Sequence, residues 1–238
     1  MQPELIIDTP PVLARVFADR FVARAREAMA ARGRFTCALP GGSVAETFFP
    51  VLTGASLVWD SVDFFWGDER AVGPDDPDSN YGLAKRLLLD PVHADPQHVH
   101  RIVGEGGDIE AAARAYEGEM RRTLGDPPHL DLVVLGLGPE GHVCSLFPGH
   151  PLLRERHRLV AAITDSPKPP PQRITFTMLP LQLAEAICIA GFGDSKAAAI
   201  RAALEDPDSQ LPVAMAIRAA RHAIVLLDPP AARLLRKV

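Results

Sequence analysis

The chain has 238 residues, of which 47% are hydrophobic and 23% are charged, a composition typical of a soluble globular protein. A net charge of −5, an aromatic content of 6% and the lack of a long Lys/Arg run argue against a nucleic-acid-binding surface. No apolar stretch is long enough to span a bilayer, and the first residues lack the basic-then-apolar pattern of a signal peptide. We therefore expect a cytoplasmic protein without a membrane or nucleic-acid partner.

Cysteine and histidine spacing gives no sign of a metal site. The cysteines are widely spaced in or near apolar sequence, at Cys37, Cys144 and Cys188. This favours reduced thiols, and no CxxC or HExxH pattern occurs. Three further histidines lie in a polar, proline-flanked loop and form no recognisable ligand set: His93, His98 and His100. We expect neither a metal nor a cofactor.

Apolar periodicity predicts an alternation of helices and strands. In chain order these are a helix at Val12–Met29, strands at Phe35–Leu39 and Val62–Trp66, a helix at Gly107–Leu124, strands at Asp131–Leu135, Leu159–Ile163 and Ala186–Ala190, a helix at Asp194–Ala203 and a strand at Ala223–Leu227. Because the strands are apolar throughout, we expect an α/β fold whose mostly parallel sheet is covered on both faces. The proline-rich stretch Ser166–Gln172 is interpreted as a rigid surface loop, so residues 1–238 are predicted to form a single domain.

The first candidate site loop is Pro40–Ser43, which follows a predicted strand and precedes a helix. Ligands of such sheets bind beyond the carboxyl ends of the strands. The paired glycines Gly41 and Gly42 would let the backbone approach an anion, and the N–H groups of a helix start favour negative charge. A tight turn with Ser43 as the N-cap is the alternative interpretation.

The second candidate loop contains Asp68 and Arg70, directly after the strand Val62–Trp66. Consecutive charges at this point usually mean only that the chain has reached water, but this loop leaves the sheet at the same edge as the glycine pair. Farther along, Ser79 or Asn80 is expected to cap a helix.

The third candidate loop is GLGPEGHVCSLFPGHP, residues 136–151. Its glycines fit the G-x-G-x-x-G pattern of dinucleotide-binding folds, and Asp165 follows at a suitable distance for a ribose contact. However, Pro148 would end any helix after barely two turns. We therefore favour a turn that presents His142 as a base, and we interpret the nearby Cys144 as structural.

The fourth candidate site comprises Arg173, after the proline run, and Lys196, near the start of a predicted helix. A lysine at a helix N-terminus opposes the helix dipole, and a bound anion would reverse that penalty. A solvated lysine and a surface ion pair are the alternatives.

Together these stretches resemble the 6-phosphogluconolactonase family. The matching motifs occur in order through most of the chain: LPGGS, the DER of GDERAVGPDDPDSNYGLAKRLLL, GLGPEGHVCSLFPGHP, KPPPQRITFT and GFGDSK. The resemblance implies a Rossmann-like three-layer fold similar to that of glucosamine-6-phosphate deaminase. Deaminases share the GGS turn and the glycine–histidine loop but are expected to have DEY in place of DER. The family usually has Asp where this chain has Glu140.

The resemblance implies hydrolysis of 6-phospho-D-glucono-1,5-lactone to 6-phosphogluconate. A lactone needs a base for water, a proton for the leaving ring oxygen and stabilisation of the oxyanion, and a histidine can perform both proton transfers near neutral pH. We expect His142 to do so, oriented by Glu140 or Asp68, with Arg70 on the oxyanion or the phosphate. The residues expected to anchor the phosphate are Gly41, Gly42, Ser43, Arg173 and Lys196.

Three other functions are weighed against this hypothesis. An amino-sugar-phosphate deaminase or isomerase is disfavoured by Arg70 in place of the expected tyrosine. A sugar-phosphate-sensing regulator would need a DNA-binding module, but residues 1–34 contain no basic recognition element. A dinucleotide-binding protein is the third alternative. Whether the protein is a monomer or a small homo-oligomer is left open.

Overall fold

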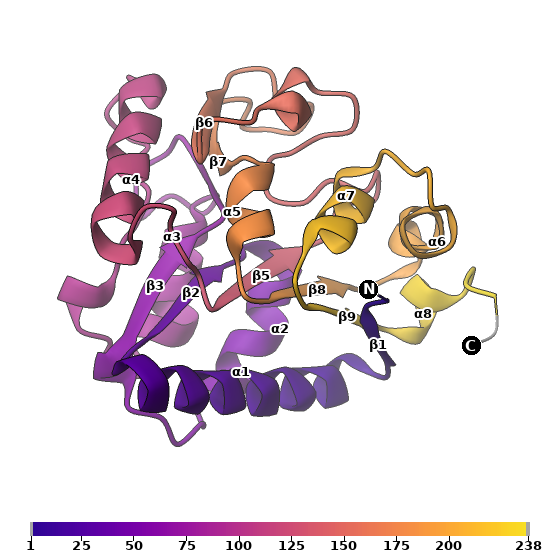
Figure 1. Ribbon diagram of the computed structural model, residues 1–238, viewed down its shortest axis with the longest axis horizontal. Helices are drawn as coiled ribbons and strands as arrows, with labels where there is room; N and C mark the ends of the chain where they lie inside the picture. Colours follow the sequence, from indigo (N-terminus) through magenta and orange to yellow (C-terminus); the bar gives the residue numbers. More distant parts are fainter. Residues whose placement is uncertain (1, 237–238) are drawn as a thin grey trace.

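The computed structural model describes residues 2–236, which contain a parallel sheet of six strands. From edge to edge these are β1 (Glu4–Ile7), β9 (Ala223–Leu227), β8 (Ile187–Gly191), β5 (Leu132–Gly136), β2 (Phe35–Leu39) and β3 (Val62–Trp66). Figure 1 shows this sheet crossing the middle of the molecule. Five of its strands were predicted to within one residue at each end, which confirms the mostly parallel sheet. The short β1 was not predicted.

A second, antiparallel sheet lies beside the first. The predicted strand at Leu159–Ile163 exists as β6 (Val160–Ile163), but it belongs to this smaller sheet. β6 pairs with β7 (Arg173–Phe176), and β7 pairs with β4 (Asp68–Arg70). The sequence therefore predicted β6 correctly as a strand but did not reveal the sheet to which it belongs.

Gly67 connects the two sheets by turning the chain directly from β3 into β4. Its N–H donates to the carbonyl of Leu39 at 3.4 Å, and its own carbonyl accepts from the N–H of Phe176 at 2.8 Å. The expectation that Asp68 and Arg70 lie in a loop is therefore wrong. Three charged residues carry no hydrophobic alternation, so their strand conformation depends on pairing with β7, which lies far along the chain.

Helices cover both faces of the central sheet and complete the predicted three layers (Figure 1). On one face lie α1 (Pro10–Arg32) and α2 (Gly42–Leu52), where the rings of Phe17 and Phe48 stack with centroids 4.5 Å apart. The other face carries α5 (Met178–Leu183), α7 (Pro212–Ala219) and the second sheet, against which α4 (Ile109–Leu124) packs. The remaining helical segments are α3 (Asn80–Ala84), η2 (Lys85–Leu89), α6 (Ala197–Glu205), α8 (Pro229–Ala232) and short turns at Trp59–Ser61, Pro96–His98, Pro151–Arg154 and Asp194–Lys196.

The predicted helices are present with small changes at their ends. α1 and α4 agree with the helices predicted at Val12–Met29 and Gly107–Leu124. α6 begins three residues later than predicted because Asp194 starts a 3₁₀ turn, and its carboxylate pairs with Arg233. Ser79 caps α3 as predicted, since its hydroxyl accepts from the N–H of Gly82 at 3.0 Å.

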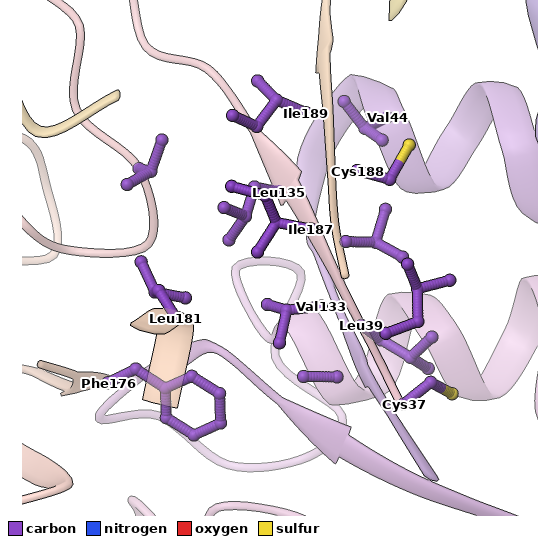
Figure 2. Close-up of a cluster of buried hydrophobic side chains, with 14 of the residues drawn as sticks. Cys37, Leu39, Val44, Val133, Leu135, Phe176, Leu181, Ile187, Cys188 and Ile189 are labelled. Carbon is purple, nitrogen blue, oxygen red and sulfur yellow. The ribbon is translucent and has the colours of Figure 1, made fainter. Parts of the chain in front are cut away.

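Apolar side chains fill both faces of the central sheet (Figure 2). Toward the second sheet point Val133, Leu135, Ile187 and Ile189, which gather with Phe176 and Leu181. Toward α2 point Cys37, Leu39 and Cys188, which gather with Val44. Burial on both faces explains why these strands are apolar throughout, and it confirms that Cys37 and Cys188 are buried free thiols.

A buried polar cluster occupies the amino end of β3. The carboxylate of Asp63 lies 3.0 Å from Nδ1 of His98 and 3.1 Å from Nε2 of His100, and it pairs with Arg34 at 2.7 Å. Nδ1 of His100 contacts Glu119 of α4 at 2.7 Å. Although burial lowers it, these two carboxylates raise the pKa of His100 above its ordinary value. The cluster ties β3 to α4.

Candidate active site

A cavity of about 300 Å³ opens at the carboxyl end of the central sheet, beside Leu39 of β2, Gly136 of β5 and Ala190 of β8. The strand order reverses here, since β2 is followed by β3 on one side whereas β5 leads to β8 and β9 on the other. Ligands of open α/β sheets bind at such a switch point. The cavity therefore lies where this fold offers a site.

Residues from all four candidate loops meet in this cavity. Its lining includes Gly41, Gly42, Ser43, Asp68, Arg70, His142, Arg173 and Lys196. Glu140 is not part of the lining but contacts His142. Four cationic side chains line the cavity, those of Arg70, Lys168, Arg173 and Lys196. Only two carboxylates lie in or beside it, those of Asp68 and Glu140. The excess of positive charge favours an anionic ligand.

His142 is presented by a tight turn. The N–H of Gly138 donates to the carbonyl of His142 at 3.0 Å, and that of Gly141 donates to the carbonyl of Gly138 at 3.0 Å. No helix lies between Gly136 and Pro148, where the chain follows turns, in agreement with the turn favoured from the sequence. A Cβ on Gly138 would lie 1.9 Å from Nδ1 of His142. Gly138 therefore leaves the space that the imidazole occupies.

The imidazole of His142 is only 15% exposed and is backed by a carboxylate. Nδ1 lies 3.1 Å from Oε1 of Glu140, at hydrogen-bond distance but without hydrogen-bond alignment. Burial lowers the pKa of His142 below 6.5, and the opposing charge of Glu140 does not fully compensate. The ring is therefore neutral at neutral pH, and an Nδ1–H facing Glu140 leaves Nε2 as the proton acceptor.

Lys168 is a site residue that the sequence did not reveal. Its Nζ donates to Oε2 of Glu140 at 2.9 Å. Burial raises the pKa of Glu140, but this hydrogen bond and the nearby positive charge more than offset it and lower the pKa below 4.5. The only signal in the sequence is a lone lysine within the proline-rich loop, a pattern that by itself predicts no more than a rigid surface loop.

Asp68, the other carboxylate expected to orient His142, is engaged elsewhere. Its Oδ2 accepts from the hydroxyl of Ser145 at 2.6 Å, and its Oδ1 lies 3.4 Å from Nδ2 of Asn80. Arg173 is 3.9 Å away through Nη1. Glu140, not Asp68, is thus the carboxylate beside Nδ1.

Arg70 and Arg173 lie opposite each other because β4 and β7 pair. Nη1 of Arg70 donates to the carbonyl of Asp78 at 2.6 Å. Arg173 is only 4% exposed, and burial, reinforced by the charge of Arg70, lowers its pKa. Two adjacent guanidinium groups at the cavity wall add to its affinity for anions.

Glu69, the middle residue of the DER motif, fixes this wall from the side facing away from the cavity. Only 2% exposed, its carboxylate accepts from the hydroxyl of Ser79 at 3.0 Å and from the N–H groups of Arg70, Asn80 and Tyr81 at 2.8 Å. Burial raises the pKa of Glu69 despite these hydrogen bonds. One buried carboxylate therefore joins the DER motif to Ser79, Asn80 and Tyr81 around the start of α3.

Asn80, also not predicted as a site residue, brings this wall against the glycine turn. Its Nδ2 donates to the carbonyl of Asp68 at 2.9 Å. A Cβ on Gly41 would lie 1.8 Å from Oδ1 of Asn80. Gly41 is needed for this close approach of the two loops.

The N-terminus of α2 faces the cavity without a side-chain cap. The alternative in which Ser43 caps this helix is wrong, because the N-cap is Gly41 and no side chain accepts there. Gly42 has a φ of +61°, a conformation that favours glycine. First-turn N–H groups without a cap form an anion site. Lys196 faces the same cavity, and burial, followed by the charge of Lys168, lowers its pKa.

The features that suggested other chemistry do not form such sites. Burial raises the pKa of the Cys144 thiol well above 9.0, so it is not a thiolate nucleophile. Asp165 contacts His150 at 3.2 Å and lies outside the cavity lining. Within residues 2–236, no group of three or more His, Cys, Asp or Glu side chains is arranged to hold a metal ion. In the same part of the chain, no helix is both long and apolar enough to cross a membrane.

Comparison with known proteins places the chain in a family. The model of the "Glucosamine-6-phosphate isomerases/6-phosphogluconolactonase" family matches residues 8–226. A protein of Rattus norvegicus named 6-phosphogluconolactonase is 39% identical, with 97% of this chain and 92% of the relative aligned. One of the same name from Mycobacterium tuberculosis is 38% identical over 93% of both chains.

Solved structures show the same fold. A 6-phosphogluconolactonase from Trypanosoma brucei superposes with a TM-score of 0.87 and 25% identity, covering 99% of both chains. A monomeric glucosamine-6-phosphate deaminase superposes with a TM-score of 0.83 at 23% identity, covering 99% of this chain and 100% of the other, which confirms the predicted likeness of fold. Because the match spans nearly the whole chain and these sequence relatives share more than a third of its residues, the chain belongs to the 6-phosphogluconolactonase family.

Proposed function

We propose that this protein hydrolyses 6-phospho-D-glucono-1,5-lactone to 6-phosphogluconate, the second step of the oxidative pentose phosphate pathway. One observation carries the proposal: an imidazole backed by a carboxylate shares a cavity with an uncapped helix N-terminus and several cationic side chains. The names of the relatives support the same substrate. We place the reaction in the cytoplasm, without a nucleic-acid or membrane partner.

The proposed reaction uses His142 for two proton transfers. Nε2 takes a proton from water while the resulting hydroxide attacks the lactone carbonyl carbon, which becomes tetrahedral and carries an oxyanion. When this intermediate collapses, the bond between the carbonyl carbon and the ring oxygen breaks, and the imidazolium returns its proton to that oxygen. The new carboxylic acid then loses its proton to solvent. Glu140 stabilises the transient imidazolium through Nδ1.

The phosphate of the substrate is proposed to lie at the N-terminus of α2. Gly42 and Ser43 line the cavity at this helix start, which has no side-chain cap, and the ammonium of Lys196 lines the same space without a hydrogen-bond or ion-pair partner among residues 2–236. Charge-assisted hydrogen bonds to such an anion contribute about 1.5–3 kcal/mol each. The phosphate therefore supplies most of the binding energy and orients the lactone toward His142.

Arg70 is assigned to the phosphate rather than to the oxyanion. Its guanidinium is held by the carbonyl of Asp78, on the segment whose Asn80 packs against Gly41. The proximity of that segment to Gly41 supports the assignment of Arg70 to the phosphate. Replacing Arg70 by Gln is accordingly expected to raise KM more than it lowers kcat.

The proposed function is tested by assaying freshly prepared lactones, with the product oxidised by a coupled dehydrogenase. We expect kcat/KM for the phosphorylated lactone to exceed that for unphosphorylated gluconolactone by about 100-fold or more, and Lys196→Met to reduce this preference. Equal rates on the two lactones would contradict the phosphate site. Ammonia release from glucosamine 6-phosphate, with no lactone hydrolysis, would assign the protein to deaminase chemistry instead.

A further inference from the structure

Two residues of the loop Ser166–Gln172, Lys168 and Pro169, line the active-site cavity, and Lys168 makes a charged contact there. Nζ of Lys168 donates to Oε2 of Glu140 at 2.9 Å, while Oε1 of the same carboxylate lies 3.1 Å from Nδ1 of His142. The Lys168 and Glu140 side chains are only 38% and 36% exposed. One carboxylate therefore connects the loop lysine to the imidazole.

Arg173 holds that loop in place. Its Nε donates to the carbonyl of Pro170 at 3.1 Å, and its Nη2 donates to the carbonyls of Lys168 and Pro169 at 3.2 and 3.0 Å. The hydroxyl of Ser166 also donates to the carbonyl of Lys168, at 2.8 Å. The planar guanidinium of an arginine can donate to several successive carbonyls at once. The single ammonium group of a lysine could not make the same set of hydrogen bonds. Most of the hydrogen-bonding capacity of Arg173 is thus used within the protein.

Lys168 and Lys196 both line the cavity but have different surroundings. The ammonium of Lys196 makes no hydrogen bond or ion pair among the described residues 2–236, whereas the charge of Lys168 is balanced by Glu140. An ammonium already neutralised by a carboxylate has less attraction for a substrate phosphate. The geometry therefore favours Lys196 as the phosphate ligand and gives Lys168 another role.

We propose that Lys168 is a positioning residue for the reaction: it holds Glu140 turned toward His142, and Arg173 positions Lys168 by fixing the loop. This inference rests on the proposed function, in which His142 is the base. It reassigns Arg173 from an expected phosphate ligand to a residue that fixes the loop.

The electrostatic consequence has a definite sign. The charge of Glu140 raises the pKa of His142, and the charge of Lys168 lowers it. Removing the ammonium with Glu140 still in place would therefore raise the pKa of His142. If Lys168 holds Glu140, its loss also lets that carboxylate turn away, and because Glu140 affects the ring more than Lys168 does, the pKa of His142 is expected to fall. Removing the charge of Glu140 moves it downward.

A double-mutant cycle tests the proposal. We expect Lys168→Met to lower kcat by about tenfold with KM changed less than about twofold, and Lys168→Arg to restore much of the loss. Because Lys168 acts through Glu140, adding Lys168→Met to Glu140→Gln is expected to cause little further loss. Lys196→Met is the matched comparison and raises KM, whereas the exposed Lys85→Met leaves both constants unchanged. The positioning role would be overturned if the fold-losses in kcat of the two single variants multiplied in the double variant. It would also be overturned if Lys168→Met raised KM and left kcat unchanged.

A second measurement separates this inference from the proposed function. Histidine titration by NMR, without substrate, is expected to show a lower pKa for His142 in Lys168→Met than in the wild type, because Glu140 is no longer held beside the ring. An equal or higher pKa would show that Glu140 stays in place without Lys168 and would overturn the proposal. A wild-type protein that hydrolyses no lactone would disprove the proposed function, yet the titration would still report on the contact.

Discussion

At the scale of single residues, the state of His142 depends on its neighbours more than on the imidazole itself. Burial favours the neutral ring, and Glu140 favours the charged ring. A base needs to be neutral before it receives the proton, but it also needs a stabilised charge afterwards. Burial favours the neutral ring before the proton transfer, and Glu140 stabilises the imidazolium after it.

The pH dependence of the reaction follows from this balance. Because only neutral His142 accepts a proton and its pKa is lowered from 6.5, we expect kcat/KM to fall on the acid side with a midpoint below pH 6.5. His142→Asn is expected to lower kcat by about 10²–10⁴-fold without unfolding the protein. The rate of the coupled assay between pH 5 and 8 measures the first effect. An acid limb centred above pH 7, or a variant with the wild-type rate, would contradict the role of His142.

At this scale the sequence identified most of the site but not how its members are used. His142, Arg70 and Lys196 were recognised because they follow strand ends in a distinctive motif order. The pairing of Glu140 with His142, and the presence of Lys168, depend on side-chain contacts between loops. No local pattern predicts such contacts.

At the scale of elements, the pairing of β4 with β7 builds one wall of the cavity. Alternation along a strand points Asp68 and Arg70 to the cavity and Glu69 to the other side, where it holds the start of α3. The sequence predicted a charged loop here because a three-residue strand has no periodicity to detect. Its conformation is determined by Arg173–Phe176.

Glu69→Gln tests this connection. An amide nitrogen would face two of the N–H or O–H donors that the carboxylate now accepts, so we expect the free energy of unfolding to fall by about 2–4 kcal/mol. KM is also expected to rise, because Arg70 and Asn80 lose their common support. Urea denaturation measures the stability, with the exposed Glu27→Gln as the control. Equal stability of the two variants would show that Glu69 does not brace the wall.

At the scale of the whole molecule, one continuous core joins the two sheets. The cluster of buried apolar residues extends from α1 through the central sheet to β6, β7 and α4. The hydroxyl of Tyr116 in α4 donates to the carbonyl of Trp66 at 3.1 Å and accepts from its N–H at 2.8 Å, at the point where β3 ends. Neither sheet therefore has a core of its own.

This continuity predicts that residues 1–238 unfold as a single domain. Trp66 is fully buried at the junction of the sheets, so the fluorescence of a Trp59→Phe variant, which lacks the other tryptophan, reports on their contact. We expect the fluorescence transition in urea to coincide with the loss of far-UV circular dichroism. Two separate transitions would indicate that the second sheet is an independent unit.

The sequence by itself determined the α/β class, the five main parallel strands and the set of loops that carry the chemistry, because apolar runs and loop motifs are local properties of the chain. Only the tertiary structure decided that β4 is a strand, that Glu140 rather than Asp68 faces Nδ1, and that Arg173 grips a loop. These outcomes depend on which distant segments meet and on how many hydrogen bonds each buried polar group can satisfy there. A charged side chain at a strand end therefore points to a site, whereas its partners in the folded protein decide what it does.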